Sequence, residues 1–229
     1  MFGISRITTQ IRRPATTIPG AIPPAIPPAI LGAILAVMLL AAPLAGQARA
    51  QAVQDASRFL ADLTDRAVDR LTEPGLSDDE QERRFRSLIG EGFDIPAIGR
   101  FVLGRYWRRA SEADRASFLA TFEDLIVQRF LPLFAEYSGG KISIGVARPF
   151  TSNPNFISVS STLLRDEGEP IQIDWRVRRR DDGYRIVDIV AEGISIAVTL
   201  RSEYTAVLKQ NGGNIDALVR KLRAMIERL

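Results

Sequence analysis

The spacing of the apolar residues changes twice along this chain, and these two changes limit most strongly what it can fold into. Up to Tyr137 the apolar residues recur at the spacing of amphipathic helices, and after Gly139 and Gly140 they alternate with polar residues. From Ile194 onward the helical spacing returns. Because the first spacing suits helices and the second suits strands with one buried face, the chain divides into helices, strands and helices again. This order predicts an α+β fold, with a helical layer packed on one face of an antiparallel sheet.

Three helices are predicted between the N-terminal segment and residue 109, and two of them have recognisable N-caps. Residues 51–71 form an amphipathic stripe. Ser77 followed by Glu80 is the spacing of a capping box, so it predicts the start of a second helix. Asp94 is suited to cap a third helix, and Pro96 is tolerated in its opening turn.

A fourth helix is predicted after Ser111, and its apolar face is unusually wide. Pro132 lies within it and is expected to kink or split it. The bulky side chains of the third and fourth helices provide more apolar surface than a thin core needs, which is a first indication of an apolar pocket. The face of the fourth helix comprises Phe118, Phe122, Leu125, Ile126, Phe130, Leu133 and Tyr137.

About four antiparallel strands are predicted from the alternating part of the chain, near residues 141–146, 156–164, 171–178 and 184–190. Asp181, Asp182 and Gly183 are predicted to close a hairpin between the last two strands. The polar positions of the third strand, which include Gln172 and Asp174, are expected to face solvent. The predicted inward-facing residues are Ile142, Ile144, Val146, Ile157, Val159, Ile171, Ile173, Trp175 and Val177.

The first 50 residues have the pattern of a cleaved secretory signal. Residues 29–44 are apolar except for two interruptions, and residues 48–50 (Ala-Arg-Ala) supply the small-x-small pattern that signal peptidase recognises. A permanent membrane span is the weaker interpretation, because a span needs about 20 apolar residues. We therefore expect cleavage after Ala50, leaving residues 51–229 as a single exported domain.

Composition excludes several classes of function for that domain. The chain has 30 Lys and Arg against 27 Asp and Glu. Removing residues 1–50 takes away four arginines and no acid, which leaves 26 against 27. A nearly neutral domain gives no support for binding nucleic acid. The absence of Cys means that packing, not disulfides, must stabilise it, and the absence of His removes the commonest general base and metal ligand.

Few residues are candidates for catalysis. The sequence has no phosphate-binding or dinucleotide-binding glycine motif and no acids at metal-ligand spacing, so we expect no cofactor and no metal. Asp174 and Asp188 on neighbouring strands would be a possible acid–base pair. The favoured interpretation is that Asp174 faces solvent and that Asp188 caps a helix or pairs with an arginine, which leaves no catalytic residue.

A run of arginines lies at the end of the third strand and in the following turn: Arg176, Arg178, Arg179 and Arg180. The favoured interpretation is a solvated face, since acids are interleaved nearby. A docking surface for an acidic partner or for lipid phosphate remains a second interpretation.

Several blocks of this sequence, in the same order, resemble the MlaC family, also called the toluene-tolerance proteins. The similarity covers nearly all of residues 55–229. The blocks are Phe93 with Asp94, residues 102–107 (Val-Leu-Gly-Arg-Tyr-Trp), Phe118 with Phe122, residues 137–139, residues 170–176, residues 183–190, residues 192–195 and residues 201–204.

The resemblance implies a non-enzymatic, periplasmic carrier of phospholipid that maintains outer-membrane lipid asymmetry. Its implied partners are an inner-membrane ABC lipid transporter complex and an outer-membrane lipoprotein–porin complex, and its implied fold is NTF2-like with extra helices over a twisted sheet. Three alternatives stay open: a carrier of hopanoid or another lipid, an NTF2-like enzyme using Asp174 or Asp188, and a structural adaptor that binds envelope proteins and has a closed core. The residues that the resemblance implies for acyl-chain contact are Leu103, Tyr106, Phe122, Leu125, Ile171, Ile173 and Trp175.

Overall fold

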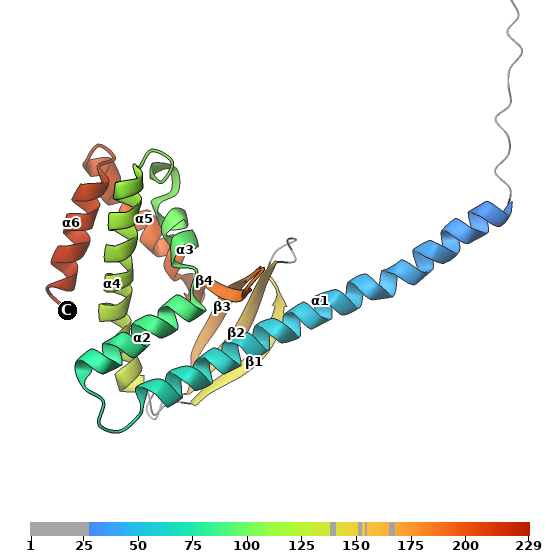
Figure 1. Ribbon diagram of the computed structural model, residues 1–229, viewed down its shortest axis with the longest axis horizontal. Coiled ribbons are helices and arrows are strands. Elements are labelled where there is room, and N and C mark those ends of the chain that lie inside the picture. The colour runs from blue at the N-terminus through green and yellow to red at the C-terminus, as the bar shows by residue number, and fades with distance from the viewer. Residues whose placement is uncertain (1–27, 138–140, 151–152, 154, 165–167) are drawn as a thin grey trace, which may run out of the picture. The chain divides into compact units, whose positions relative to one another are not determined.

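The computed structural model describes residues 28–137, 141–150, 153, 155–164 and 168–229 (Figure 1). The break predicted at Gly139 and Gly140 and the first 27 residues of the predicted signal lie outside this range. The chain divides into two compact units, Met1–Leu44 and Ala45–Leu229. In the first unit the described residues form the beginning of helix α1 (Pro28–Leu71). Within the described residues, we find no helix with both the length and the apolarity that a membrane crossing demands.

The predicted helices before the sheet are present, and both predicted N-caps are confirmed. The Ser77 side chain accepts a hydrogen bond from the backbone N–H of Glu80, and that of Asp94 accepts one from Ala97. Each cap satisfies a backbone donor that the first helical turn would leave unpaired. The elements are α2 (Asp78–Gly92), α3 (Ile95–Leu103), a short 3-10 helix η1 (Gly104–Tyr106) and α4 (Glu112–Tyr137).

Of the two effects expected of Pro132, a kink or a split of helix α4, the split does not occur. The helix runs through Pro132 as one element as far as Tyr137. A proline removes one backbone hydrogen bond, and the packing of a long helix against its neighbours can offset that loss. The partly buried Ile126, Phe130 and Leu131, which precede Pro132, pack against the main core.

The strands form one antiparallel sheet with the order β1-β2-β3-β4-β5, as the α+β prediction required. The loop at Asp181 and Asp182 closes the hairpin between β3 and β4, as predicted. The chain then returns to helix in α5 (Ile196–Gln210) and α6 (Ile215–Ile226). The strands are β1 (Lys141–Pro149), β2 (Phe156–Leu164), β3 (Ile171–Arg180), β4 (Gly183–Ala191) and a two-residue β5 (Ile194–Ser195).

Strand β1 contains a bulge that the alternating pattern did not predict. The pairing with β2 shifts between Ile144 and Ala147. The extra residue changes which side chains point inward, so Ala147 packs on the core while Val146 is 75% exposed. The expectation that Val146 faces inward is therefore wrong.

The part of helix α1 that belongs to the second unit, from Ala45 to Leu71, lies across the apolar face of the sheet (Figure 1). Tyr184 of β4 fixes this contact, since its hydroxyl donates a hydrogen bond of 3.0 Å to the carbonyl of Ala52. Its ring also lies 6.1 Å from that of Phe59. The buried side chains of Leu60 and Leu63 extend the same core toward α2.

The remaining helices, α3 to α6, gather beside β4 (Figure 1). The segment between α2 and α3 continues the sheet there, because Phe93 forms an isolated parallel bridge with Ile186. The N–H of Asp94 donates to the carbonyl of Ile186 at 2.9 Å. The helical part of the molecule is thus attached to one edge of the sheet and one of its faces.

Candidate functional site

The seven residues predicted to contact acyl chains fall into two groups. Leu103 on α3, Tyr106 on η1 and Phe122 and Leu125 on α4 belong to the helices, and we call them the helix group. The second group, which we call the strand group, lies on β3 and consists of Ile171, Ile173 and Trp175.

The helix group lies inside a tightly packed aromatic core. All four of its side chains are buried, and those of Leu103 and Phe122 are almost completely so. The Phe122 ring stacks on Phe118 at 5.5 Å, and Tyr204 of α5 meets both rings edge-on at 6.1 and 6.3 Å. Such stacked and edge-on pairs add stability beyond their buried area.

The strand group lies on the apolar face of the sheet and is only partly buried. In register with these residues on β2 are Leu163, opposite Ile171, and Ser161, opposite Ile173. The one polar residue of this surface is paired, because the indole N–H of Trp175 donates to the Ser161 hydroxyl at 2.8 Å. An apolar, half-exposed face with its polar groups satisfied is chemically suited to contact with hydrocarbon.

Two surface pockets have volumes of about 250 and 450 Å³. The smaller is lined by Tyr106 of the helix group together with Arg109, Asp114 and the turn before α6. The larger is lined by Arg70, Arg83, Arg84 and Ser87. Their charged linings do not suit acyl chains, so neither pocket is a candidate site for hydrocarbon.

Tyr204 carries a polar atom that is buried in the aromatic core without a partner. Its hydroxyl is inaccessible to solvent and makes no hydrogen bond to any residue that the structure describes. Burial raises the pKa of Tyr204 well above its ordinary value of 10.0. A buried donor without a partner costs stability, so the protein should be more stable with a phenylalanine at position 204 than with the tyrosine.

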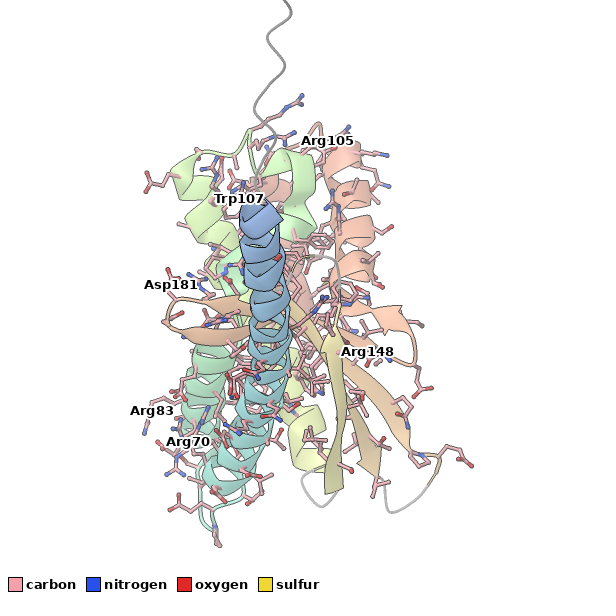
Figure 2. The ribbon with its side chains drawn as sticks, turned by 90° about the vertical axis from the view of Figure 1, so that its right-hand side faces the viewer. Arg70, Arg83, Arg105, Trp107, Arg148 and Asp181 are labelled. Carbon is pink, nitrogen blue, oxygen red and sulfur yellow. The ribbon has the colours of Figure 1, made fainter. Side chains whose placement is uncertain are left out.

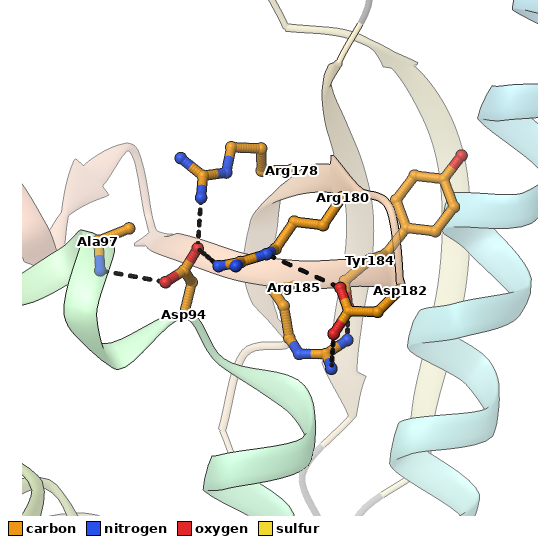
Figure 3. Close-up of polar contacts among 7 residues, drawn as sticks. All are labelled: Asp94, Ala97, Arg178, Arg180, Asp182, Tyr184 and Arg185. Atoms are coloured by element: carbon orange, nitrogen blue, oxygen red, sulfur yellow. Dashed lines mark hydrogen bonds and ion pairs between the residues drawn. The ribbon is translucent and has the colours of Figure 1, made fainter.

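Arg178 and Arg180 share a buried acidic partner that the sequence did not indicate. Both donate to the same carboxylate oxygen of the buried Asp94, at 2.6 and 2.8 Å (Figure 3). The second oxygen of Asp94 accepts from the N–H of Ala97 at 3.1 Å. One carboxylate therefore caps α3 and joins it to β3. The side chains of Arg178 and Arg180 are 33% and 44% exposed, so they are solvated in part as the sequence suggested, and the contact with Asp94 is what the sequence did not indicate.

Asp188 has the structural role that the sequence favoured. It joins the start of α5 to β3, as Asp94 joins the start of α3. One of its oxygens accepts from Arg176 at 2.8 Å and from the Ser195 hydroxyl at 2.7 Å. The other accepts from the N–H of Ala197 at 2.9 Å. Ser195 in turn caps the helix by accepting from the N–H of Val198.

Asp174 does not lie directly opposite Asp188. In the sheet it lies opposite Val190, and Asp188 lies opposite Arg176. The carboxylate of Asp174 instead contacts Arg148 at 3.6 Å in a partly exposed pair. In the part of the chain that the structure describes, we find no group of three or more residues suited to hold a metal ion.

Comparison with known proteins points to one family. The family model described as MlaC protein matches residues 61–224. The intermembrane phospholipid transport system binding protein MlaC of Haemophilus influenzae is 29% identical over 133 residues, which are 57% of this chain and 61% of that relative. The aligned part thus spans about three fifths of the length of this relative.

A solved structure agrees in fold. It is that of a phospholipid-binding protein from Ralstonia solanacearum in complex with a phospholipid. The TM-score is 0.68 at 19% sequence identity, and the match covers 76% of this chain and 98% of that one. At this identity the likeness establishes the shared α+β fold.

Proposed function

The chain belongs to the MlaC family, and on this premise we propose that it is a non-enzymatic carrier that binds the acyl chains of phospholipid and moves the lipid between membranes. The proposal places it in the periplasm after cleavage at Ala50. Its partners there are an inner-membrane ABC lipid transporter complex and an outer-membrane lipoprotein–porin complex, between which it maintains outer-membrane lipid asymmetry. The name of its relative from Haemophilus influenzae supports a role in intermembrane phospholipid transport.

The observation that carries the proposal is the half-exposed apolar face of β3. Ile171, Ile173 and Trp175 are apolar, partly exposed neighbours on one face of β3, and Trp175 packs against the main core. The helix group lies deeper, so we propose that the strand group contacts acyl chains first. Contact with the helix group would require α3 and α4 to move apart.

The physical chemistry of transfer is consistent with a carrier. Two acyl chains carry about 30 methylenes, so moving them from water into an apolar site is worth roughly 24 kcal/mol gross. Moving them from a bilayer into such a site is nearly neutral, because both environments are apolar. A carrier can therefore hold lipid firmly against water and still exchange it at a membrane, and it needs no catalytic residue.

A tryptophan substitution in the strand group tests the site. If Ile173 contacts acyl chains, Ile173→Trp fills part of their volume and lowers the amount of bound phospholipid. The lipid-free protein should keep or gain stability, because the new ring gains contacts. Gln172→Trp is the matched control, since its side chain lies on the opposite face of the same strand.

The measurements are lipid stoichiometry and melting curves with and without phospholipid. The stabilisation that lipid provides should fall in step with occupancy. Leu103→Trp extends the test to the helix group, where overpacking of a closed core would cost about 1–3 kcal/mol. Unchanged lipid content in Ile173→Trp and in Leu103→Trp, with lower stability of both lipid-free variants, would contradict the site.

A further inference from the structure

The adjoining surfaces of α3 and α5 carry a strip in which exposed apolar side chains alternate with arginines. The apolar members are Phe101, Val198 and Ile194, which are 41%, 52% and 65% exposed. Val198 and Arg201 lie three residues apart on α5 and hence on one side of that helix. We call Phe101, Arg105, Ile194, Val198 and Arg201 the α3–α5 strip.

The arginines of this strip are held in place by aromatic rings. The guanidinium of Arg201 lies over the Phe101 ring, 4.8 Å from its centroid. Gly104 leaves room for it, because a Cβ there would meet the guanidinium at 3.1 Å. Arg105 lies over the Tyr106 ring at 5.0 Å and donates to the Tyr106 hydroxyl at 3.0 Å. These contacts orient two cations at the surface before any partner arrives.

The same arginines lack an acidic partner. Among the described residues, no ion pair involves Arg100, Arg105 or Arg201, whereas Arg176, Arg178 and Arg180 each contact a carboxylate. The sequence from Ile95 to Ser111 also contains four arginines and no Asp or Glu. This end of the helical part therefore presents positive charge that the protein itself does not neutralise.

We propose that the α3–α5 strip docks the protein on the surface of a phospholipid bilayer that contains anionic headgroups. Guanidinium groups bind phosphate oxygens in pairs of parallel hydrogen bonds. The exposed apolar side chains of the strip can bury against the boundary between headgroups and acyl chains. The inference deepens the proposed function and rests on it for the membrane, but it concerns the docking surface and not the lipid-binding site.

A bilayer fits this strip better than an acidic protein surface does. Carboxylates of a protein would neutralise Arg105 and Arg201, but they would also lie against Val198 and Ile194 and lose hydration there. A bilayer supplies anionic groups and hydrocarbon at adjacent depths, so it satisfies both kinds of side chain.

Vesicle flotation with residues 51–229 tests this proposal. Vesicles of phosphatidylcholine with phosphatidylglycerol are compared with vesicles of phosphatidylcholine alone. The protein should bind the anionic vesicles, and added salt should weaken that binding. The double variant Arg105→Gln with Arg201→Gln should bind about thirty-fold more weakly, since each basic residue near an anionic surface is worth about a factor of five.

The matched control is the double variant Arg58→Gln with Arg83→Gln, which has the same net charge. Arg83 lies far from Arg105, toward the opposite end of the molecule, in Figure 2. Both control arginines are exposed and pair with an acid on their own helix. Val198→Ser, at an exposed position, should also weaken binding. This variant keeps the test independent of any folding defect in the arginine variants.

The lipid content of each sample, measured by native mass spectrometry, separates this inference from the proposed function. Absence of vesicle binding in a lipid-loaded wild type overturns the docking surface and leaves the carrier intact. Equal binding by the strip and control variants overturns it as well. If the strip variants lose transfer to a purified membrane complex while the wild type ignores vesicles, the partner is a protein and the proposal is wrong.

Discussion

At the scale of single residues, two buried aspartates connect helices to the sheet. Asp94 holds the start of α3 against β3, and Asp188 holds the start of α5 against the same strand. In each case one carboxylate accepts a backbone N–H of the helix and the guanidinium of an arginine from β3. A buried carboxylate that loses its partner is strongly destabilising, so mutations of these pairs should cause large losses of stability.

Reversing the charge of two neighbouring arginines should have very different effects. Arg178→Glu places a second carboxylate beside the buried Asp94 and should lower the free energy of unfolding by about 3–5 kcal/mol. Arg179→Glu, on the other face of β3, should change it by less than about 1 kcal/mol. Urea denaturation of both variants measures this. Equal losses would mean that the contact with Asp94 contributes nothing particular.

Tyr204→Phe should stabilise the protein, because it removes a buried hydroxyl that has no partner. We expect the free energy of unfolding to rise by about 1 kcal/mol. Tyr184→Phe is the control: it removes a hydroxyl that donates to Ala52 and should lower the free energy by a similar amount. Thermal denaturation of the two variants measures both changes. A Tyr204→Phe variant that is less stable than wild type would show that the Tyr204 hydroxyl has a partner.

The raised pKa of Tyr204 leads us to expect that wild type and Tyr204→Phe differ in stability at alkaline pH. Burial raises the pKa of Tyr204 above its ordinary value of 10.0, so the unfolded chain loses this proton at lower pH than the folded protein. The stability associated with the protonated phenol is complete below pH 10.0 and falls as the pH rises beyond it. Wild type should therefore lose more stability than Tyr204→Phe above that pH. Parallel denaturation curves measured across the alkaline range would argue against it.

Residue-level prediction succeeded where the signal was local. The caps at Ser77 and Asp94 depend on residues two or three positions away, so the sequence showed them directly. The contact between Asp94 and Arg178 joins residues 84 positions apart, and nothing in the local pattern indicated it. The alternation of β3 predicted which side of the strand Arg178 occupies, but it could not predict that α3 begins over that side.

At the scale of whole elements, the spacing of apolar residues predicted the order of helices and strands, and it failed where local geometry intervenes. The bulge in β1 adds one residue between Ile144 and Ala147, and alternation carries no sign of it. The helix α4 continues through Pro132, and the local preference of proline gave no sign of this. The predicted site residues fall into a helix group and a strand group for the same reason. The spacing of apolar residues shows which faces are apolar, but it does not show which of these faces pack against each other.

Helix α1 allows the domain boundary to be tested. A chain that starts at Gln51 retains Ala52, whose carbonyl accepts from Tyr184, and the buried Ala56 and Leu60. It should melt at the same temperature as a chain that starts at Ala45. A chain that starts at Ala61 loses all three residues and should be less stable by about 3 kcal/mol or more. Similar melting temperatures for the chains that start at Gln51 and Ala61 would show that residues 51–60 of α1 do not stabilise the domain.

At the scale of the whole molecule, our proposals assign three tasks to different parts. The core of helices and sheet gives stability, the strand group is proposed to contact lipid, and the α3–α5 strip is proposed to meet a membrane. The strand group lies on β3, whereas the strip involves α3, η1, β5 and α5. A carrier benefits from this separation, because docking can then change without changing what is bound.

The central claim is that this chain carries phospholipid, and one measurement tests it directly. Residues 51–229 are expressed, purified without detergent and examined by native mass spectrometry. We predict a mass shift equal to one two-chain phospholipid, and the released lipid should be identified as such by fragmentation. Ile173→Trp should reduce the shifted fraction, and Gln172→Trp should not. A wild-type protein that is folded and reproducibly free of lipid, even after incubation with phospholipid vesicles, would contradict the account.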